Sequence, residues 1–225
     1  MALAAITFDH LGTPAQMAAL RDVVERHGVT STFFVTGQRA AEDPKAVQAL
    51  HDAGHEIGMH GWAHEQWAEL DPATERALAA RATHAIADAT GVAPRGFRAP
   101  GGARSDVTAE TLAEMGYEFD ASLGDGMHTS RLGNGLAQVP FVWPGVDSYW
   151  YLRDQPADPA RVMNDWLGAL HEGIGRDRLF LTICHPEITG IDERRLAALD
   201  SVVLGAVTQG VELMTVGAIA ARIPA

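Results

Sequence analysis

The amino-acid sequence predicts an α/β fold built on a parallel sheet. Short apolar runs alternate with amphipathic stretches along nearly the whole chain, and helix-ending signals separate them. A chain of 225 residues, 47% of them hydrophobic, can bury about 70% of its unfolded surface in one core. We therefore expect residues 1–225 to form a single domain, whose sheet is either a closed barrel or an open, doubly wound sheet.

Eight short apolar runs are the expected strands. They are residues 4–8, 32–35, 56–59, 96–98, 117–119, 138–142, 179–184 and 211–214. Runs of this length that are bounded by polar or turn-forming residues are typical of strands buried on both faces. Strands that alternate with helices pair in parallel, which is why a parallel sheet is predicted.

Seven amphipathic stretches are the expected helices, and several have clear ends. They are residues 14–27, 44–53, 72–90, 108–115, 159–171, 192–208 and 216–223. Asp71 and Pro72 form an N-cap followed by proline at the first helical position, and Gly28 and Gly91 stand where helices stop. The one long irregular stretch, residues 121–137, is expected to be a loop over an active face.

Charge and composition exclude several classes of partner. The chain has 17 basic and 29 acidic residues and a net charge of −12, whereas nucleic-acid binding draws on clustered lysine and arginine. It has no basic leader segment and no run of eighteen apolar residues, so we expect a cytoplasmic protein with no membrane partner. Its single cysteine excludes an internal disulfide. The oligomeric state is left open.

Chargeable side chains recur just past the ends of the expected strands. They are Asp9, His10, His60, His64, Arg98, Asp120, Asp147 and His185. In a barrel, all parallel strands present their carboxyl ends to one rim, so these side chains would meet there. His60 and His64 have the spacing of paired metal ligands, although two separately hydrogen-bonded histidines would show the same spacing.

The remaining histidines and the cysteine receive no functional assignment. Histidines 27, 51, 55, 84 and 171 lie in or beside helical stretches without a polar strand end. Cys184 adjoins His185, but neighbouring residues in a strand point to opposite faces. If His185 faces the rim, Cys184 is a small buried hydrophobic residue and not a nucleophile.

Five motifs in order along the chain resemble the polysaccharide deacetylase family, carbohydrate esterase family 4, with its NodB-homology domain. They are Thr7-Phe-Asp-His10, Ser31-Thr-Phe-Phe-Val35, the pair His60 and His64, Arg98-Ala-Pro-Gly-Gly102, and Leu181-Thr-Ile-Cys-His-Pro186. The resemblance covers nearly the whole chain. It implies a distorted (β/α) barrel with about seven strands, fewer than the eight regular units of a complete barrel.

One position departs from the family pattern. The second aspartate of the first motif, a carboxylate metal ligand in the family, is His10 here. The resemblance then implies a set of three histidines, His10, His60 and His64. Three neutral imidazoles with one open position suit zinc, so we expect a divalent ion, zinc foremost; a site that has lost its metal is the alternative.

The resemblance also implies roles for four groups around such an ion. Asp9 would be the general base, and Arg98 would pair with it and keep it ionised. The backbone N–H near Gly101 would help to receive the oxyanion. His185, from the opposite side, would protonate the leaving amine.

We expect the aromatic stretch between residues 141 and 151 to form the wall of the substrate site. We predict that Trp143 and Trp150 wall a pocket for one or two ring-sized units. Asp147 is expected to orient a catalytic group or the substrate, as acidic residues in the family's fourth motif do. Asp120 and Asp125 compete for that role.

The predicted function is that of a metal-dependent hydrolase that removes an N-acyl group from a small, amino-sugar-like or biosynthetic substrate. Hydrolysis of another C–N bond, in a cyclic amide or ureide, is the alternative within enzymes, because allantoinase-like relatives share the fold. A ligand-binding module without a metal is the alternative outside enzymes. The metal content of the purified protein distinguishes the metal-free binding module from the metal-dependent hydrolase.

Overall fold

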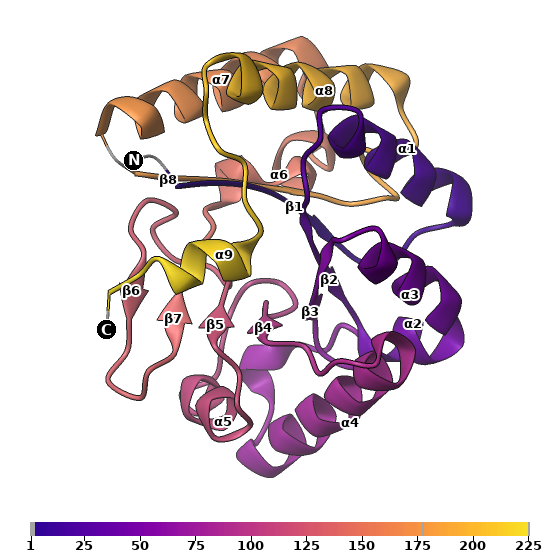
Figure 1. Ribbon diagram of the computed structural model, residues 1–225, viewed down its shortest axis with the longest axis vertical. Helices are drawn as coiled ribbons and strands as arrows, with labels where there is room; N and C mark the ends of the chain where they lie inside the picture. Colours follow the sequence, from indigo (N-terminus) through magenta and orange to yellow (C-terminus); the bar gives the residue numbers. More distant parts are fainter. Residues whose placement is uncertain (1–2, 177, 225) are drawn as a thin grey trace.

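The computed structural model describes residues 3–176 and 178–224, which form one curled sheet with helices around it (Figure 1). The strands are β1 (Leu3–Asp9), β2 (Thr32–Val35), β3 (Glu56–Met59), β4 (Gly96–Phe97), β5 (Phe119–Asp120), β6 (Ser130–Arg131), β7 (Ala137–Gln138) and β8 (Leu179–Cys184). The helices are α1 (Pro14–Glu25), α2 (Gly37–Glu42), α3 (Pro44–Asp52), α4 (Pro72–Thr90), α5 (Thr108–Glu114), α6 (Asp147–Tyr151), α7 (Pro159–Arg176), α8 (Glu193–Thr208) and α9 (Val216–Ala221). Two single 3₁₀ turns are η1 (Trp67–Glu69) and η2 (Trp143–Gly145).

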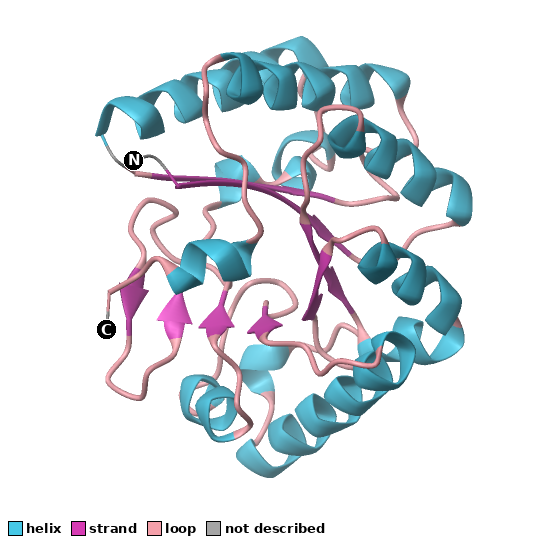
Figure 2. Cartoon of the chain, in the orientation of Figure 1, coloured by secondary structure: helices cyan, strands magenta, loops and turns pink. Residues whose placement is uncertain are grey.

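The sheet has the strand order β6-β7-β5-β4-β3-β2-β1-β8, and every pairing is parallel except that of β6 with β7. It curls into an arc that does not close, with most of the helices packed along its outside and the short helix α9 within the arc (Figure 2). The predicted distorted (β/α) barrel is therefore confirmed. The sheet has eight strands in place of about seven, because a two-residue hairpin partner, β6, extends one edge.

The first strands are buried on both faces, as their unbroken apolar sequences predict. In β1, the residues from Ala4 to Asp9 are all buried, and the ring of Phe8 stacks on that of Phe33 in β2 at 4.7 Å between centroids. β1 lies between β2 and β8, with Phe8 opposite Cys184. The carboxyl ends of these central strands consequently lie side by side.

The helix ends follow local chemistry that the sequence displays. Asp71 caps α4 by accepting from the backbone N–H groups of Ala73 and Thr74, and Gly91 ends the helix at φ 78°. α2 was not among the expected helices. It is a six-residue helix capped by Thr36, too short for an amphipathic period to be recognised.

The last predicted strand, residues 211–214, forms only an isolated bridge between Leu213 and Ala4. The segment 121–137 agrees only in part with the prediction of a loop over the active face. Leu179, the first residue of β8, donates its N–H to the Met127 carbonyl, and Arg131 donates to carbonyls of Ala220 and Ile223. Residues 127 to 131 therefore lie toward the opposite end of the sheet, whereas the start of the segment stays at the site edge, where Leu123 donates its N–H to the Gly102 carbonyl.

Within the part of the chain that the structure describes, no helix combines the length and the apolar character needed to cross a bilayer.

Candidate active site

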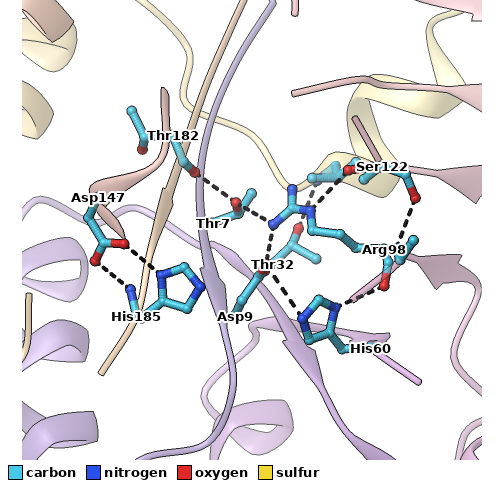
Figure 3. Close-up of polar contacts among 12 residues, drawn as sticks. Thr7, Asp9, Thr32, His60, Arg98, Ser122, Asp147, Thr182 and His185 are labelled. Carbon is cyan, nitrogen blue, oxygen red and sulfur yellow. Dashed lines mark hydrogen bonds and ion pairs between the residues drawn. The ribbon is translucent and has the colours of Figure 1, made fainter. Parts of the chain in front are cut away.

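Four strands place the predicted site residues together at the carboxyl edge of the sheet. Asp9 ends β1, His60 follows β3, Arg98 follows β4 and His185 follows β8. Parallel registers bring these ends level, since Phe8 lies opposite Cys184 and Met59 opposite Phe97. Figure 3 shows the four side chains converging from both sides of β1.

Asp9 is held by a fully buried arginine. The Arg98 guanidinium donates through Nη1 to Asp9 Oδ1 at 2.6 Å and to Thr7 Oγ1 at 2.9 Å, and through Nε to the Ala121 carbonyl at 2.9 Å. Its carbon Cζ lies 4.1 Å from the ring centre of Phe34. Burial alone would raise the pKa of Asp9, but the Arg98 charge outweighs it and the pKa falls to about 2. Asp9 is therefore a carboxylate at any pH near neutrality.

Three histidines form a compact cluster beside this carboxylate. One nitrogen from each of His10, His60 and His64 lies within 4.8 Å of the others. His10 and His64 are, among the described residues, the non-glycine positions with a left-handed backbone, at φ 74° and 65°. Such conformations are costly for side-chain-bearing residues and concentrate at functional sites. The predicted spacing of ligands thus corresponds to a real cluster.

His60 is oriented by the chain behind it. Its Nδ1 lies 2.8 Å from the Arg98 carbonyl, which leaves Nε2 on the side of the cluster, 3.9 Å from Asp9 Oδ2. Burial lowers the pKa of His60 to about 3, against the opposing effect of Asp9. Burial, with the nearby His10, also lowers the pKa of His64. Neutral imidazoles are the form that binds a metal ion.

His10 is oriented by a carboxylate that sequence reasoning missed. Its Nδ1 lies 2.6 Å from Glu187 Oε1, and its Nε2 is buried with no hydrogen-bond partner in the described residues. Glu187 follows the Cys184-His185-Pro186 segment by one residue, so its nearness to a predicted catalytic histidine was the only available signal.

The opposite side of the site is a buried His–Asp pair. His185 Nδ1 lies 2.6 Å from Asp147 Oδ1, while Asp147 Oδ2 accepts from the His185 backbone N–H and from Thr189 Oγ1, both at 2.7 Å. Burial lowers the pKa of His185, but the bond and charge of Asp147 outweigh this, and the pKa rises to about 9. His185 is therefore a cation at neutral pH.

Asp147 is bonded to His185, as an orienting residue would be, but it does not contact a substrate site. It is fully buried behind His185 and is absent from the lining of the adjoining cavity. The competing residues have other partners. Asp120 pairs with Arg104 and Ser122, and the exposed Asp125 pairs with His128.

A cavity of about 380 Å³ lies over the site. Asp9, the three clustered histidines and His185 contribute its polar wall, together with Glu187 and Ser148. The rest of its lining is Ala99, Gly101, Gly102, Phe141, Trp143, Val146, Leu152, Ile183 and Ile188. The cavity is thus apolar opposite the polar cluster.

The structure supports one predicted tryptophan wall and corrects the other. Trp143 lines the cavity and is 39% exposed at its rim. Trp150 is buried and lies in a separate cavity, where its indole N–H donates to the Pro144 carbonyl together with that of Trp166. The turn through η2 directs these neighbouring indoles to different sites, which the sequence alone does not reveal.

A second, more polar cavity of about 470 Å³ adjoins the first. Both cavities share His10, His64 and Glu187, and the second is otherwise lined mainly by α1, α2 and the loops before them, including Gln16, Gln38 and Arg39. The cluster therefore stands between an apolar and a polar chamber.

The fold and these groups define a (β/α) barrel protein whose carboxyl edge joins a carboxylate, an imidazolium and a cluster of three histidines around one cavity. The model of the polysaccharide deacetylase family matches residues 2–119, slightly more than half of the 225-residue chain. The chain belongs to the polysaccharide deacetylase family.

Individual relatives agree with this assignment. A peptidoglycan deacetylase of Helicobacter pylori is 26% identical over 160 residues, which cover 61% of this chain and 54% of that protein. The chain thus spans about half the length of this curated relative. A solved structure of a polysaccharide deacetylase-like protein from Mycobacterium smegmatis has a TM-score of 0.88 at 25% identity, covering 99% of this chain and 90% of that one.

An allantoinase, PuuE, shares the fold. Its structure has a TM-score of 0.86 at 16% identity, covering 97% of this chain and 89% of its own. At this identity the likeness concerns the arrangement of strands and helices alone.

Proposed function

We propose that this chain is a metal-dependent hydrolase that removes an N-acyl group, acetyl foremost, from an amino-sugar-like substrate. The observation that carries the proposal is that an ionised carboxylate, Asp9, and a protonated imidazole, His185, line the same cavity as the cluster of three histidines. Amide hydrolysis needs a base for the attacking water and an acid for the leaving amine.

The residues fit a divalent ion, zinc foremost. His10, His60 and His64 offer three nitrogens within 4.8 Å of one another, and His10 Nε2 is a buried nitrogen without a partner in the described residues. Three neutral imidazoles with an open position form a known catalytic zinc ligand set. The replacement of a carboxylate by His10 therefore leaves a usable donor set. A bound divalent ion would supply Lewis acidity, which polarises an acyl carbonyl and makes water more acidic.

Asp9 supplies the base. Its Oδ1 is engaged with Arg98, whereas Oδ2 lies on the side of His60 and the cavity. Because the pKa of Asp9 is about 2, it accepts a proton readily only from a water that has become unusually acidic. The low basicity of Asp9 is thus a second reason to expect a Lewis acid in this site.

His185 supplies the acid. With Nδ1 tied to Asp147, Nε2 is the atom that can donate its proton to a leaving nitrogen. Since the pKa of His185 is about 9, the proton is present at neutral pH and is transferred when the C–N bond breaks. The free amine product has a higher affinity for that proton than the amide nitrogen had.

The cavity supports a substrate of limited size around the reacting bond. A volume of about 380 Å³ lies at the lower end of the usual range of small-molecule pockets. Its apolar wall of Phe141, Trp143 and Val146 suits an acyl chain and one face of a sugar ring. We therefore propose one or two ring-sized units, although the H. pylori relative is named for peptidoglycan.

Metal analysis and an amine-release assay test the proposal together. Wild-type protein should bind about one zinc ion per chain and release amine from N-acetyl compounds. His60→Ala should lower zinc content and activity in parallel, whereas His84→Ala, on the exposed face of α4, should change neither. Full activity after exhaustive chelation would contradict the metal-dependent mechanism.

Substrate length is tested separately. Rates on N-acetyl monomers should equal or exceed those on chito-oligomers, if the cavity holds one or two rings. Rates that climb steadily with oligomer length would mean that the two adjoining cavities act as one open groove. A protein that binds no zinc and releases no amine would support the ligand-binding alternative.

A further inference from the structure

His10 makes a bond that no other member of the histidine cluster makes. Its Nδ1 faces the Glu187 carboxylate at 2.6 Å, while its Nε2 is buried and, in the described part of the chain, without a partner. An imidazole bonded through one nitrogen to a carboxylate has its tautomer and ring orientation fixed, with the other nitrogen free to bind a metal. His60 is oriented instead by a backbone carbonyl, that of Arg98.

The sheet topology brings Glu187 to this position. β1 and β8 are parallel neighbours, so the segments that follow them leave the sheet side by side. Gly12 permits close contact there, because a Cβ at Gly12 would lie 2.4 Å from Cβ of Pro186. The contact fixes the turn after β8 against the turn after β1, with Glu187 beside His10.

The charge of this pair matches the departure at position 10. An imidazole in place of a carboxylate ligand removes one negative charge from the immediate surroundings of a dication. Glu187 returns a carboxylate one side chain farther out, and its side chain, 48% exposed, borders both cavities. A carboxylate that bonds to one nitrogen of a metal-binding histidine raises the basicity of the other nitrogen, which binds the metal.

We propose that Glu187 is a positioning residue for the metal site, and that its carboxylate holds His10 with Nε2 directed at His60 and His64. The inference rests on the proposed function, since it presupposes a divalent ion at the cluster. We infer in addition that His10 and Glu187 act as one unit. The two residues together replace a single carboxylate ligand.

Zinc affinity, measured by competition with a chromophoric chelator, tests the unit without reference to activity. Glu187→Ala should weaken zinc binding about a hundredfold and Glu187→Gln about tenfold, because glutamine keeps an acceptor but loses the charge. The matched control is Asp200→Asn, which removes the charge from another histidine–carboxylate pair, that of His27 at 2.9 Å. It should leave zinc affinity unchanged.

Two further measurements separate positioning from a general structural effect. In the His10→Ala background, Glu187→Gln should have no additional effect on zinc affinity, because the residue through which it acts is absent. The visible absorption spectrum of the Co²⁺-loaded protein should change in Glu187→Gln and not in Asp200→Asn. The chelator-treated variants should unfold at the wild-type temperature.

Three outcomes would overturn the inference. They are wild-type zinc affinity in Glu187→Ala, an equal loss in the presence and absence of His10, and an unchanged cobalt spectrum. A result that contradicts the proposed hydrolase function can be told apart from these three outcomes. Zinc binding that depends on Glu187 in a protein without hydrolase activity would leave the inference standing, whereas a wild-type protein that binds no zinc would remove both.

Discussion

Two buried aspartates, Asp9 and Asp147, lie on opposite sides of the site and are each paired with a cation. Asp9 is 4% exposed, borders the cavity and is paired with Arg98. Asp147 is fully buried, lies behind the cavity wall and is paired with His185. Both carboxylates are thus removed from bulk water and satisfied by neighbours from other strands.

The difference lies in what each partner can do with a proton. Arginine keeps its proton, so the pair lowers the pKa of Asp9 and leaves a carboxylate facing the cavity. Histidine can give its proton away, so the pair raises the pKa of His185 and presents an acid to the same cavity. An aspartate is therefore itself the base on one side of the site and supports an acid, His185, on the other. The partner of each aspartate decides between these two roles.

The largest effect is expected from removing the base side. Asp9→Asn should lower kcat by about a hundredfold to ten-thousandfold with KM within about threefold, because loss of a general base affects the transition state more than the ground state. Steady-state kinetics on an N-acetyl substrate measures both constants. A variant with wild-type turnover would show that the base is another group.

Next comes the stability of the Asp9 pair. Arg98→Met leaves the buried Asp9 without its cation and should lower the free energy of unfolding by about 3–5 kcal/mol. Arg76→Met is the control, since Arg76 pairs with Glu114 on the surface, and it should have no measurable effect in urea unfolding. Equal effects of the two variants would mean that Asp9 is not buried as described.

On the acid side, the expected effect depends on pH. In the wild type, kcat/KM should fall above pH about 9, the pKa of His185. In Asp147→Asn the pKa should fall to the ordinary imidazole value of about 6.5 or below, with roughly a thirtyfold loss at pH 8 and little loss at pH 6. Asp125→Asn, at an exposed loop, should keep the wild-type profile. An identical limb in Asp147→Asn would disprove the pairing.

The His185–Asp147 pair should also make the free energy of unfolding depend on pH. Because folding raises the pKa of His185 from 6.5 to about 9, its contribution to the free energy of unfolding is complete below pH about 6.5 and declines as pH rises through about 9. The stability difference between wild type and Asp147→Asn should therefore be largest near pH 6 and smaller at pH 10. Urea titrations at the two pH values measure it.

The smallest effects are expected in the aromatic wall, which both sides of the site share. Trp143→Ala should raise KM about threefold to tenfold, the amount typical of one lost aromatic contact, without loss of stability. Trp150→Phe should leave KM unchanged and cost about 1 kcal/mol of stability, because it removes the buried bond to Pro144. A raised KM in Trp150→Phe with an unchanged KM in Trp143→Ala would show that Trp150, and not Trp143, contacts the substrate.

Much of the first half of the molecule is predictable from sequence. β2, β3 and α4 have the predicted bounds, and the chargeable residues after β1, β3 and β4 converge as expected. Continuous apolar runs and capping residues act locally, so their consequences can be read without knowing the rest of the fold. The second half is less predictable, because β5, β6 and β7 are two residues long and exist through pairing with neighbours.

The sequence by itself determined the alternation of strands and helices, and with it the fact that Asp9, His60, Arg98 and His185 meet at one edge. Parallel strands place their carboxyl ends on one side whatever the detailed packing. Only the tertiary structure decided which groups touch: Asp147 behind His185, Glu187 beside His10, and Trp150 away from the cavity. The first two contacts join segments distant in the chain, and the directions in which side chains such as Trp150 point across a turn are set by packing and not by spacing.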